Sequence, residues 1–214
     1  MVAAVNHIMK TSPLRFLGIA ACAALMMMTG RVANAAAQIG RPAPDFTLND
    51  VQQKPHRLAD YKGKIVVLEW VNPECPFVKK HYNSGNIPKL QQSAAADGVV
   101  WLLINSGYPG SQGDYETAKM EQWLKEKNAA PTAYFRDQDA KVGKLYGAKT
   151  TPHFFIIDRD GQLVYNGAID SIRSADPSDI KNAENYVASA LEALKKNVPV
   201  ATPSTQPYGC AVKY

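Results

Sequence analysis

Short apolar runs alternate with amphipathic stretches along most of the chain, separated by turns rich in Gly, Pro, Asn and Asp. The run 65–68 is mostly β-branched and predicts a strand buried on both faces, and 99–105 predicts a second one. Residues 76–96 between them are helical in pattern, with a pause near 83–86. We therefore expect a parallel βαβ unit at the centre of the domain.

The rest of the chain continues this alternation of strands and helices. The patterns predict an N-terminal hairpin over 45–58, helices over 114–127, 140–146 and 176–196, a short strand at 134–135, and a hairpin of 153–157 with 162–165. Three prolines from 199 onward predict an irregular C-terminal tail. The fold class that follows is α/β, with a central mixed β-sheet flanked by helices.

Cys75 stands where the first predicted strand meets the first predicted helix. Pro73 ends the extended run, and Pro76 suits the first turn of a helix, so Cys75 is expected at or beside the N-cap. Unpaired N–H groups, the helix dipole and Lys79 one turn further on all favour a negative sulfur. The pattern indicates a reactive thiolate, and a buried structural cysteine is the alternative.

Two segments carry a family resemblance. The turn Trp-Val-Asn-Pro-Glu-Cys-Pro at 70–76 and the segment Gly-x-x-Ala-Pro-x-Phe-x-Leu at 40–48 resemble the peroxiredoxin-like (redoxin, AhpC/TSA) branch of the thioredoxin-like superfamily. The resemblance implies a thioredoxin-like fold with Cys75 as the nucleophile. Val78 stands at the position of the second cysteine of thioredoxin, so no resolving thiol lies nearby in the sequence.

Thr151-Pro152 opens the strand at 153–157 and resembles the cis-proline of thioredoxin folds. In that family the proline lies beside the nucleophilic cysteine, and the backbone of the preceding residue pairs with the bound substrate chain. The resemblance therefore implies that Thr151 and Pro152 bind substrate, while Pro76 and Lys79 support the thiolate.

Cys210 is the second cysteine outside residues 1–35. The segment from Asn197 to Cys210 spans up to roughly 43 Å when extended, so the tail can reach most of a domain of this size. The ending Gly-Cys-x-Val-Lys-aromatic resembles one redoxin subgroup, which implies a resolving role for Cys210. A stable disulfide with Cys75 and an unpaired surface thiol remain open.

The resemblance leaves the reaction open between peroxide reduction and thiol–disulfide exchange. Asn72 stands where peroxiredoxins have Thr or Ser, and Pro152 where they have Arg. Both departures weaken the case for fast peroxidase chemistry, whereas exchange needs an exposed thiolate and a backbone edge. The expected enzyme is a thiol-dependent oxidoreductase acting on a small peroxide or a protein disulfide, with an unidentified thioredoxin-like electron donor and a possible homodimer.

Two alternatives do not involve thiol catalysis. One is a thioredoxin-fold protein that only binds partners. The other is metal or copper handling by Cys75 with His56, His81 or His153, whose spacing is a weak metal-binding pattern. We expect no metal and no cofactor.

Residues 1–35 have the layout of a secretory signal peptide, with basic Lys10 and Arg15, an apolar stretch at 16–28 and a small-residue end. The boundaries expected are 1–35 for this signal, 36–198 for the redoxin domain and 199–214 for the tail. An uncleaved membrane anchor through 16–28 and lipidation at Cys22 are the less favoured alternatives.

Removal of residues 1–35 lowers the formal net charge from +5 to +2, because Lys10, Arg15 and Arg31 leave with it. The basic character is thus partly an export signal, and nothing indicates a nucleic-acid partner. An exported, periplasmic protein with two remaining cysteines is expected, in a compartment that permits disulfides.

Overall fold

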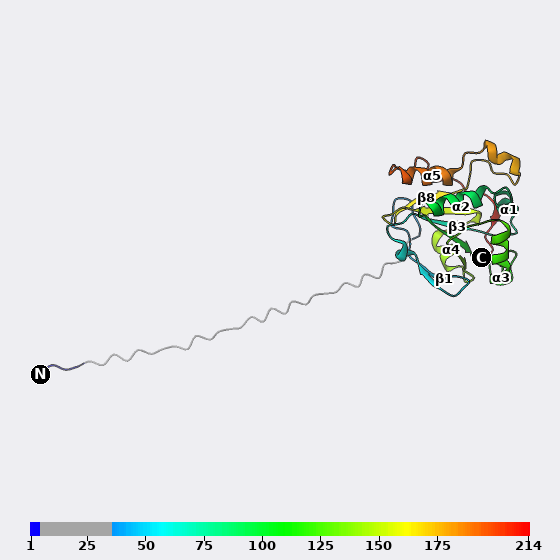
Figure 1. Ribbon diagram of the computed structural model, residues 1–214. Coiled ribbons are helices and arrows are strands. Elements are labelled where there is room, and N and C mark those ends of the chain that lie inside the picture. Colours follow the sequence, from blue (N-terminus) through cyan, green and yellow to red (C-terminus); the bar gives the residue numbers. More distant parts are fainter. Residues whose placement is uncertain (5–35) are drawn as a thin grey trace. The chain divides into compact units, whose positions relative to one another are not determined.

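The computed structural model describes residues 1–4 and 36–214. The chain divides into two units, Met1–Val32 and Ala33–Tyr214, and the fold below is that of the second (Figure 1). Apart from residues 1–4, the predicted signal peptide lies outside the described residues, and so do the alternative anchor at 16–28 and Cys22. Within the described part of the chain, no helix has the length and apolar character needed to cross a bilayer.

A five-stranded mixed sheet forms the centre, in the order β5-β4-β3-β7-β8. Its strands are β3 (Val66–Trp70), β4 (Val100–Asn105), β5 (Ala133–Arg136), β7 (His153–Ile157) and β8 (Leu163–Gly167). Strands β3, β4 and β5 run parallel to one another, whereas β7 pairs antiparallel with both β3 and β8. The predicted parallel βαβ unit and the predicted hairpin are both confirmed.

Helices and short elements surround the sheet (Figure 1). They are β1 (Thr47–Asn49), β2 (Pro55–Arg57), η1 (Leu58–Tyr61), α1 (Pro76–Asn83), α2 (Asn86–Ala96), α3 (Thr117–Glu126), α4 (Lys141–Tyr146), β6 (Thr150–Thr151), η2 (Pro177–Asn182), α5 (Tyr186–Lys195) and β9 (Cys210–Ala211). The thioredoxin-like α/β fold with an N-terminal hairpin is therefore confirmed.

Alternation along β3 divides the core into two layers, because successive side chains of a strand point to opposite faces. Val67 packs in a cluster with residues of α1, α2, α3 and α5. Val66, Leu68 and Trp70 pack in a second cluster with α4, η1 and the N-terminal segment. All five residues of β3 are buried, as a central strand covered on both faces must be.

Two helix predictions need correction. The segment 176–196 is not one helix but η2 followed by α5, because Ala183 is extended and Asn185 caps α5 by accepting the N–H of Ala188. Helix α3 begins at Thr117 rather than at 114. The Asp114 carboxylate instead binds the Gly110 N–H and Arg136, which holds the preceding residues in a loop.

The tail is mostly irregular, but its end carries a strand that the sequence did not predict. Strand β9 pairs antiparallel with β6, so that Cys210 lies opposite Thr151. Tail residues also bind β8, where the Thr205 N–H donates to the Asn166 carbonyl (3.1 Å). The Thr151–Pro152 peptide bond is cis, as expected.

Candidate active site

Strand β3 delivers Cys75 to the start of α1 through a loop fixed by Asn72. The Asn72 side chain accepts the Glu74 N–H (2.9 Å) and donates to the Gln112 carbonyl (3.1 Å), while the Cys75 N–H donates to the Asn72 carbonyl (3.0 Å). Cys75 is the N-cap residue of α1, and Pro76 is its first helical residue. The predicted location of Cys75 is therefore confirmed.

The Cys75 sulfur lies against the edge formed by Thr151. Its Sγ donates a hydrogen bond to the Thr151 carbonyl (3.0 Å), and the residue is 0% exposed. The side chain makes no capping hydrogen bond to the amides of α1. The nucleophile candidate and the cis-proline edge are thus in direct contact. Because Cys75 is fully buried, a substrate can reach its sulfur only after the residues that cover it move.

Cys210 is the group that lies beside Cys75. It is half-buried, packs against the core cluster that contains Cys75, and pairs through β9 with Thr151, whose carbonyl accepts the Cys75 thiol. Both thiols are free rather than joined in a disulfide. The pairing of β9 with β6 therefore places a second thiol next to the first.

Cys210 does not ionise readily in this position. The pKa of Cys210 is raised, first by burial and then by the adjacent Cys75 thiol, with Lys213 acting weakly in the opposite direction. Two adjacent thiols resist holding two negative charges at once, so ionisation of one suppresses ionisation of the other. Cys210 therefore keeps its proton near pH 7.

The predicted supporting residues near Cys75 lie at the surface. Pro76 and Lys79 are both exposed, and the assistance of Lys79 to a thiolate remains a prediction. The next residue, Lys80, instead turns inward: its side chain is 0% exposed, and its Nζ lies 3.9 Å from Oδ2 of Asp170.

Asp170 and Tyr208 are functional candidates that the sequence analysis missed. The Tyr208 hydroxyl donates to Oδ1 of Asp170, and the Tyr208 ring lies 5.7 Å from that of Phe77 in the first turn of α1. Both residues are buried. The one sequence signal was an aromatic residue two positions before Cys210.

The match to a family model shows which family the chain belongs to. The model of the AhpC/TSA family matches residues 39–166, which is more than half of the chain and includes Cys75, Thr151 and Pro152. The chain belongs to the AhpC/TSA family. The match ends well before Cys210, so the second thiol of this AhpC/TSA protein lies outside the matched region.

Curated relatives of this AhpC/TSA chain carry enzyme names. It is 30% identical over 135 residues to the thiol-disulfide oxidoreductase ResA of Geobacillus thermodenitrificans, covering 60% of this chain and 68% of the relative. It is 31% identical over 127 residues to the thiol:disulfide interchange protein DsbE of Pseudomonas aeruginosa, covering 58% and 63%. These names confirm the predicted class, a thiol-dependent oxidoreductase.

A solved structure resembles the AhpC/TSA chain over most of its length. The crystal structure of an uncharacterized conserved protein from Geobacillus kaustophilus superposes with a TM-score of 0.70 at 28% identity, covering 83% of this chain and 92% of the other. The likeness extends well beyond the region that the family model matches.

Among residues 1–4 and 36–214, no group of three or more His, Cys, Asp or Glu side chains could hold a metal ion. All three candidate histidines have other side-chain partners. His153 binds Asn166 (2.8 Å), His56 binds Asp50 (2.9 Å) and His81 binds Asn86 (2.9 Å). Burial lowers the pKa of His153 to about 4, so this ring is neutral near pH 7.

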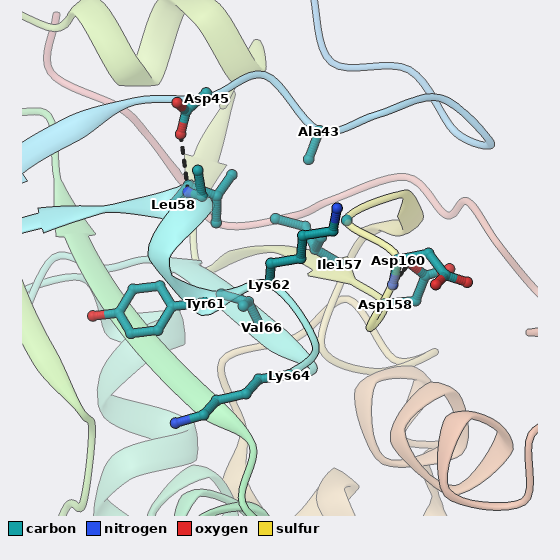
Figure 2. Close-up of a pocket in the computed structure, with 12 residues that line it drawn as sticks. Ala43, Asp45, Leu58, Tyr61, Lys62, Lys64, Val66, Ile157, Asp158 and Asp160 are labelled. Carbon is teal, nitrogen blue, oxygen red and sulfur yellow. Dashed lines mark hydrogen bonds between the residues drawn. The ribbon is translucent and has the colours of Figure 1, made fainter.

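One cavity of this AhpC/TSA domain lies away from the cysteines. It has a volume of about 240 Å³ and is lined by apolar Leu58, Val66 and Ile157 together with Lys62 (Figure 2). Val66 begins β3, whereas Cys75 follows the opposite end of that strand. The cavity is therefore separate from the thiol chemistry.

Proposed function

We propose that this protein is an exported thiol–disulfide oxidoreductase in which Cys75 is the nucleophile and Cys210 the resolving thiol. The observation that carries the proposal is the placement of both thiols at one point, where α1 begins and β9 pairs with the Thr151 edge. Export is supported by the layout of residues 1–35.

The first step is attack on a substrate disulfide. The Cys75 thiolate bonds to one substrate sulfur, the substrate S–S bond breaks, and the other substrate sulfur leaves as a thiolate that takes up a proton. Cys75 and the substrate are then joined in a mixed disulfide. The Thr151 edge would bind the substrate backbone, as it now binds β9.

The second step releases the substrate. In the mixed disulfide Cys75 can no longer ionise, so repulsion between two adjacent thiolates no longer opposes the ionisation of Cys210. Cys210 then loses its proton and attacks the Cys75 sulfur, the mixed disulfide breaks, and the second substrate thiol leaves. The substrate has gained two electrons and two protons, and the Cys75–Cys210 disulfide is reduced again by an external dithiol of the thioredoxin-like class.

Peroxide reduction is a second candidate, and the AhpC/TSA family match favours it. Cys75 would attack the peroxide to give a sulfenic acid and an alcohol or water, and Cys210 would then displace water to form the same disulfide. Against fast peroxidase chemistry, both polar ends of the Asn72 side chain are already engaged in the loop. The possible homodimer stays a prediction.

The central test compares three cysteine variants of the full chain in stopped-flow oxidation by a disulfide peptide and by hydrogen peroxide. We expect Cys75→Ser to abolish turnover, because the nucleophilic sulfur is gone. The fold should stay intact, because one sulfur-to-oxygen change at the start of a helix should lower the stability of the protein little. Cys210→Ser should trap the mixed disulfide, seen by mass under non-reducing conditions. Cys22→Ser is the matched control and should keep full activity.

Substantial turnover by Cys75→Ser would refute the assignment of the nucleophile. The absence of a Cys75–Cys210 linkage in non-reducing peptide maps of the oxidised wild type would refute the role of Cys210. A peroxide rate far above the rate with the peptide would select the second candidate instead.

A further inference from the structure

Four buried side chains connect the C-terminal tail to the helix that begins at Cys75. They are Lys80 and His81 of α1, Asp170 after β8, and Tyr208 in the tail, and together they are called the Tyr208 anchor below. The Tyr208 hydroxyl lies 3.4 Å from Nε2 of His81 and donates to Oδ1 of Asp170. The anchor thus ties a residue two positions before Cys210 to the helix of Cys75.

The hydrogen bonds of the anchor run in one direction. Burial, with a smaller effect of the Lys80 charge, lowers the pKa of His81 to about 3, so its ring is neutral near pH 7. The side-chain amide of Asn86 donates to Nδ1 (2.9 Å), which leaves the ring proton on Nε2, facing the Tyr208 oxygen. Tyr208 therefore accepts from His81 and donates to Asp170.

The Asp170 carboxylate is the final acceptor in this series of hydrogen bonds. Its Oδ2 is buried without a hydrogen-bond partner and faces Nζ of Lys80 at 3.9 Å. With His81 neutral, Lys80 is the cation that offsets the carboxylate. A hydrogen bond from a neutral donor to such a buried carboxylate is stronger than one between two neutral groups. Tyr208 therefore makes a strong side-chain contact between the tail and the domain.

The chain on the other side of Gly209 is held just as closely. A Cβ placed on Gly209 would lie 2.1 Å from the Thr151 carbonyl oxygen, so the backbones touch there. Beyond it, Cys210 pairs with Thr151, and the Val212 N–H donates to the Lys149 carbonyl (3.1 Å). Tyr208 and β9 thus fix the tail on both sides of the point where it meets Cys75.

We propose that Tyr208, acting through Asp170 and His81, is a positioning residue that holds the tail on Cys75. This rests on the proposed function, in which Cys75 attacks and Cys210 resolves. The same contact has two opposite effects. It seats Cys210 for the second step, and it covers the fully buried Cys75 sulfur during the first.

A disulfide reaches Cys75 only while the tail is lifted, so the rate of the first step scales with the lifted fraction. In the mixed disulfide the bound group occupies the space beside Cys75. The seated tail is then a minor state, and the rate of resolution scales with its population. Weakening the anchor should therefore speed the first step and slow the second, which a general loss of structure would not do.

The test is Tyr208→Phe in a Cys22→Ser background of the full chain, with 5,5′-dithiobis(2-nitrobenzoate) as the disulfide. Attack by Cys75 breaks the reagent's S–S bond, forms a mixed disulfide and releases one coloured thiolate. Attack by Cys210 on the Cys75 sulfur releases the second thiolate and leaves the Cys75–Cys210 disulfide. The two phases of colour thus report the two steps separately.

We expect the first phase to be about tenfold faster and the second about tenfold slower, the scale of one hydrogen bond to a charged group. Tyr146→Phe is the matched control, since its hydroxyl donates to the Pro44 carbonyl (2.7 Å), which belongs neither to the tail nor to the Tyr208 anchor, and it should change neither phase. Hydrogen exchange at residues 208–212 should be faster in Tyr208→Phe alone. An unchanged rate in either phase, or a change in the same direction in both, would overturn the proposal.

Failure of the proposed function would look different. A wild-type chain that releases a single thiolate per molecule would refute resolution by Cys210, and the seating role of Tyr208 would be refuted with it. Two phases in wild type that Tyr208→Phe leaves unaltered would refute the seating role alone.

Discussion

Glu69 is an acidic side chain in the middle of the central strand, and its replacement by Gln gives a sharp test of the core. The residue is 0% exposed and accepts hydrogen bonds from Trp101 Nε1 (2.7 Å), Tyr82 (3.0 Å) and Gln91 (3.4 Å). Burial raises its pKa from 4.5 to about 7, and the three donors limit the rise. Gln has nearly the same shape but does not titrate.

The size and sign of the effect follow from linkage. A pKa near 7 in the folded chain against 4.5 in the unfolded chain corresponds to about 3 kcal/mol. Because the folded pKa is the higher one, the folded chain binds more protons in this interval. The stabilisation from Glu69 is therefore complete below pH 4.5 and is lost as the pH rises through about 7.

The assay is urea unfolding of wild type and Glu69→Gln at roughly pH 4 and roughly pH 8. From the lower to the higher pH, the free energy of unfolding of the variant should rise by about 3 kcal/mol relative to that of wild type. Any effect of the amide that is the same at both pH values cancels in this comparison. Glu126→Gln, at the exposed end of α3, is the control and should change the difference little. Parallel pH profiles for wild type and Glu69→Gln would refute the reasoning.

Two further predictions concern the tail and the buried lysine. Gly209→Ala places a methyl group against the Thr151 carbonyl and should destabilise the seated tail by about 1–3 kcal/mol, measured by hydrogen exchange of β9. Gly110→Ala, where φ is also positive (+77° against +141° at Gly209) and the surrounding space is open, tests a positive φ without the collision. Lys80→Met should lower the free energy of unfolding by about 3–5 kcal/mol in urea, because it leaves a buried carboxylate unpaired. Lys79→Met beside it is exposed and should change that free energy by about 0.5 kcal/mol or less; equal effects would contradict the argument.

Local patterns were sufficient for most of the fold and for the place of Cys75. The β-branched run before it and the prolines at 73 and 76 determine a strand, a loop and a helix start within a dozen residues. The cis peptide at Thr151–Pro152 could be expected only from the family resemblance, since sequence alone rarely distinguishes the two isomers.

Contacts between distant segments could not be predicted. The pairing of Cys210 with Thr151 joins residues far apart in the chain. A strand of two residues has too little sequence pattern to predict which strand it pairs with. Asp170 and Tyr208 each look ordinary in sequence, and only the tertiary fold buries them together. The sequence does indicate that Glu69 is unusual, because a carboxylate within a run of buried strand residues needs hydrogen-bond donors. The pattern does not predict which residues those donors are.

Cys75 and Cys210 are 135 positions apart in the sequence. The bond proposed between them would close the part of the domain from α1 to β9 into a covalent ring. Closing a ring of this size removes freedom from the unfolded chain worth about 5 kcal/mol in the simplest entropy model. The oxidised protein, which carries the disulfide after it has reduced its substrate, would therefore be more stable against unfolding. The reduced protein, with both thiols free, would unfold more easily.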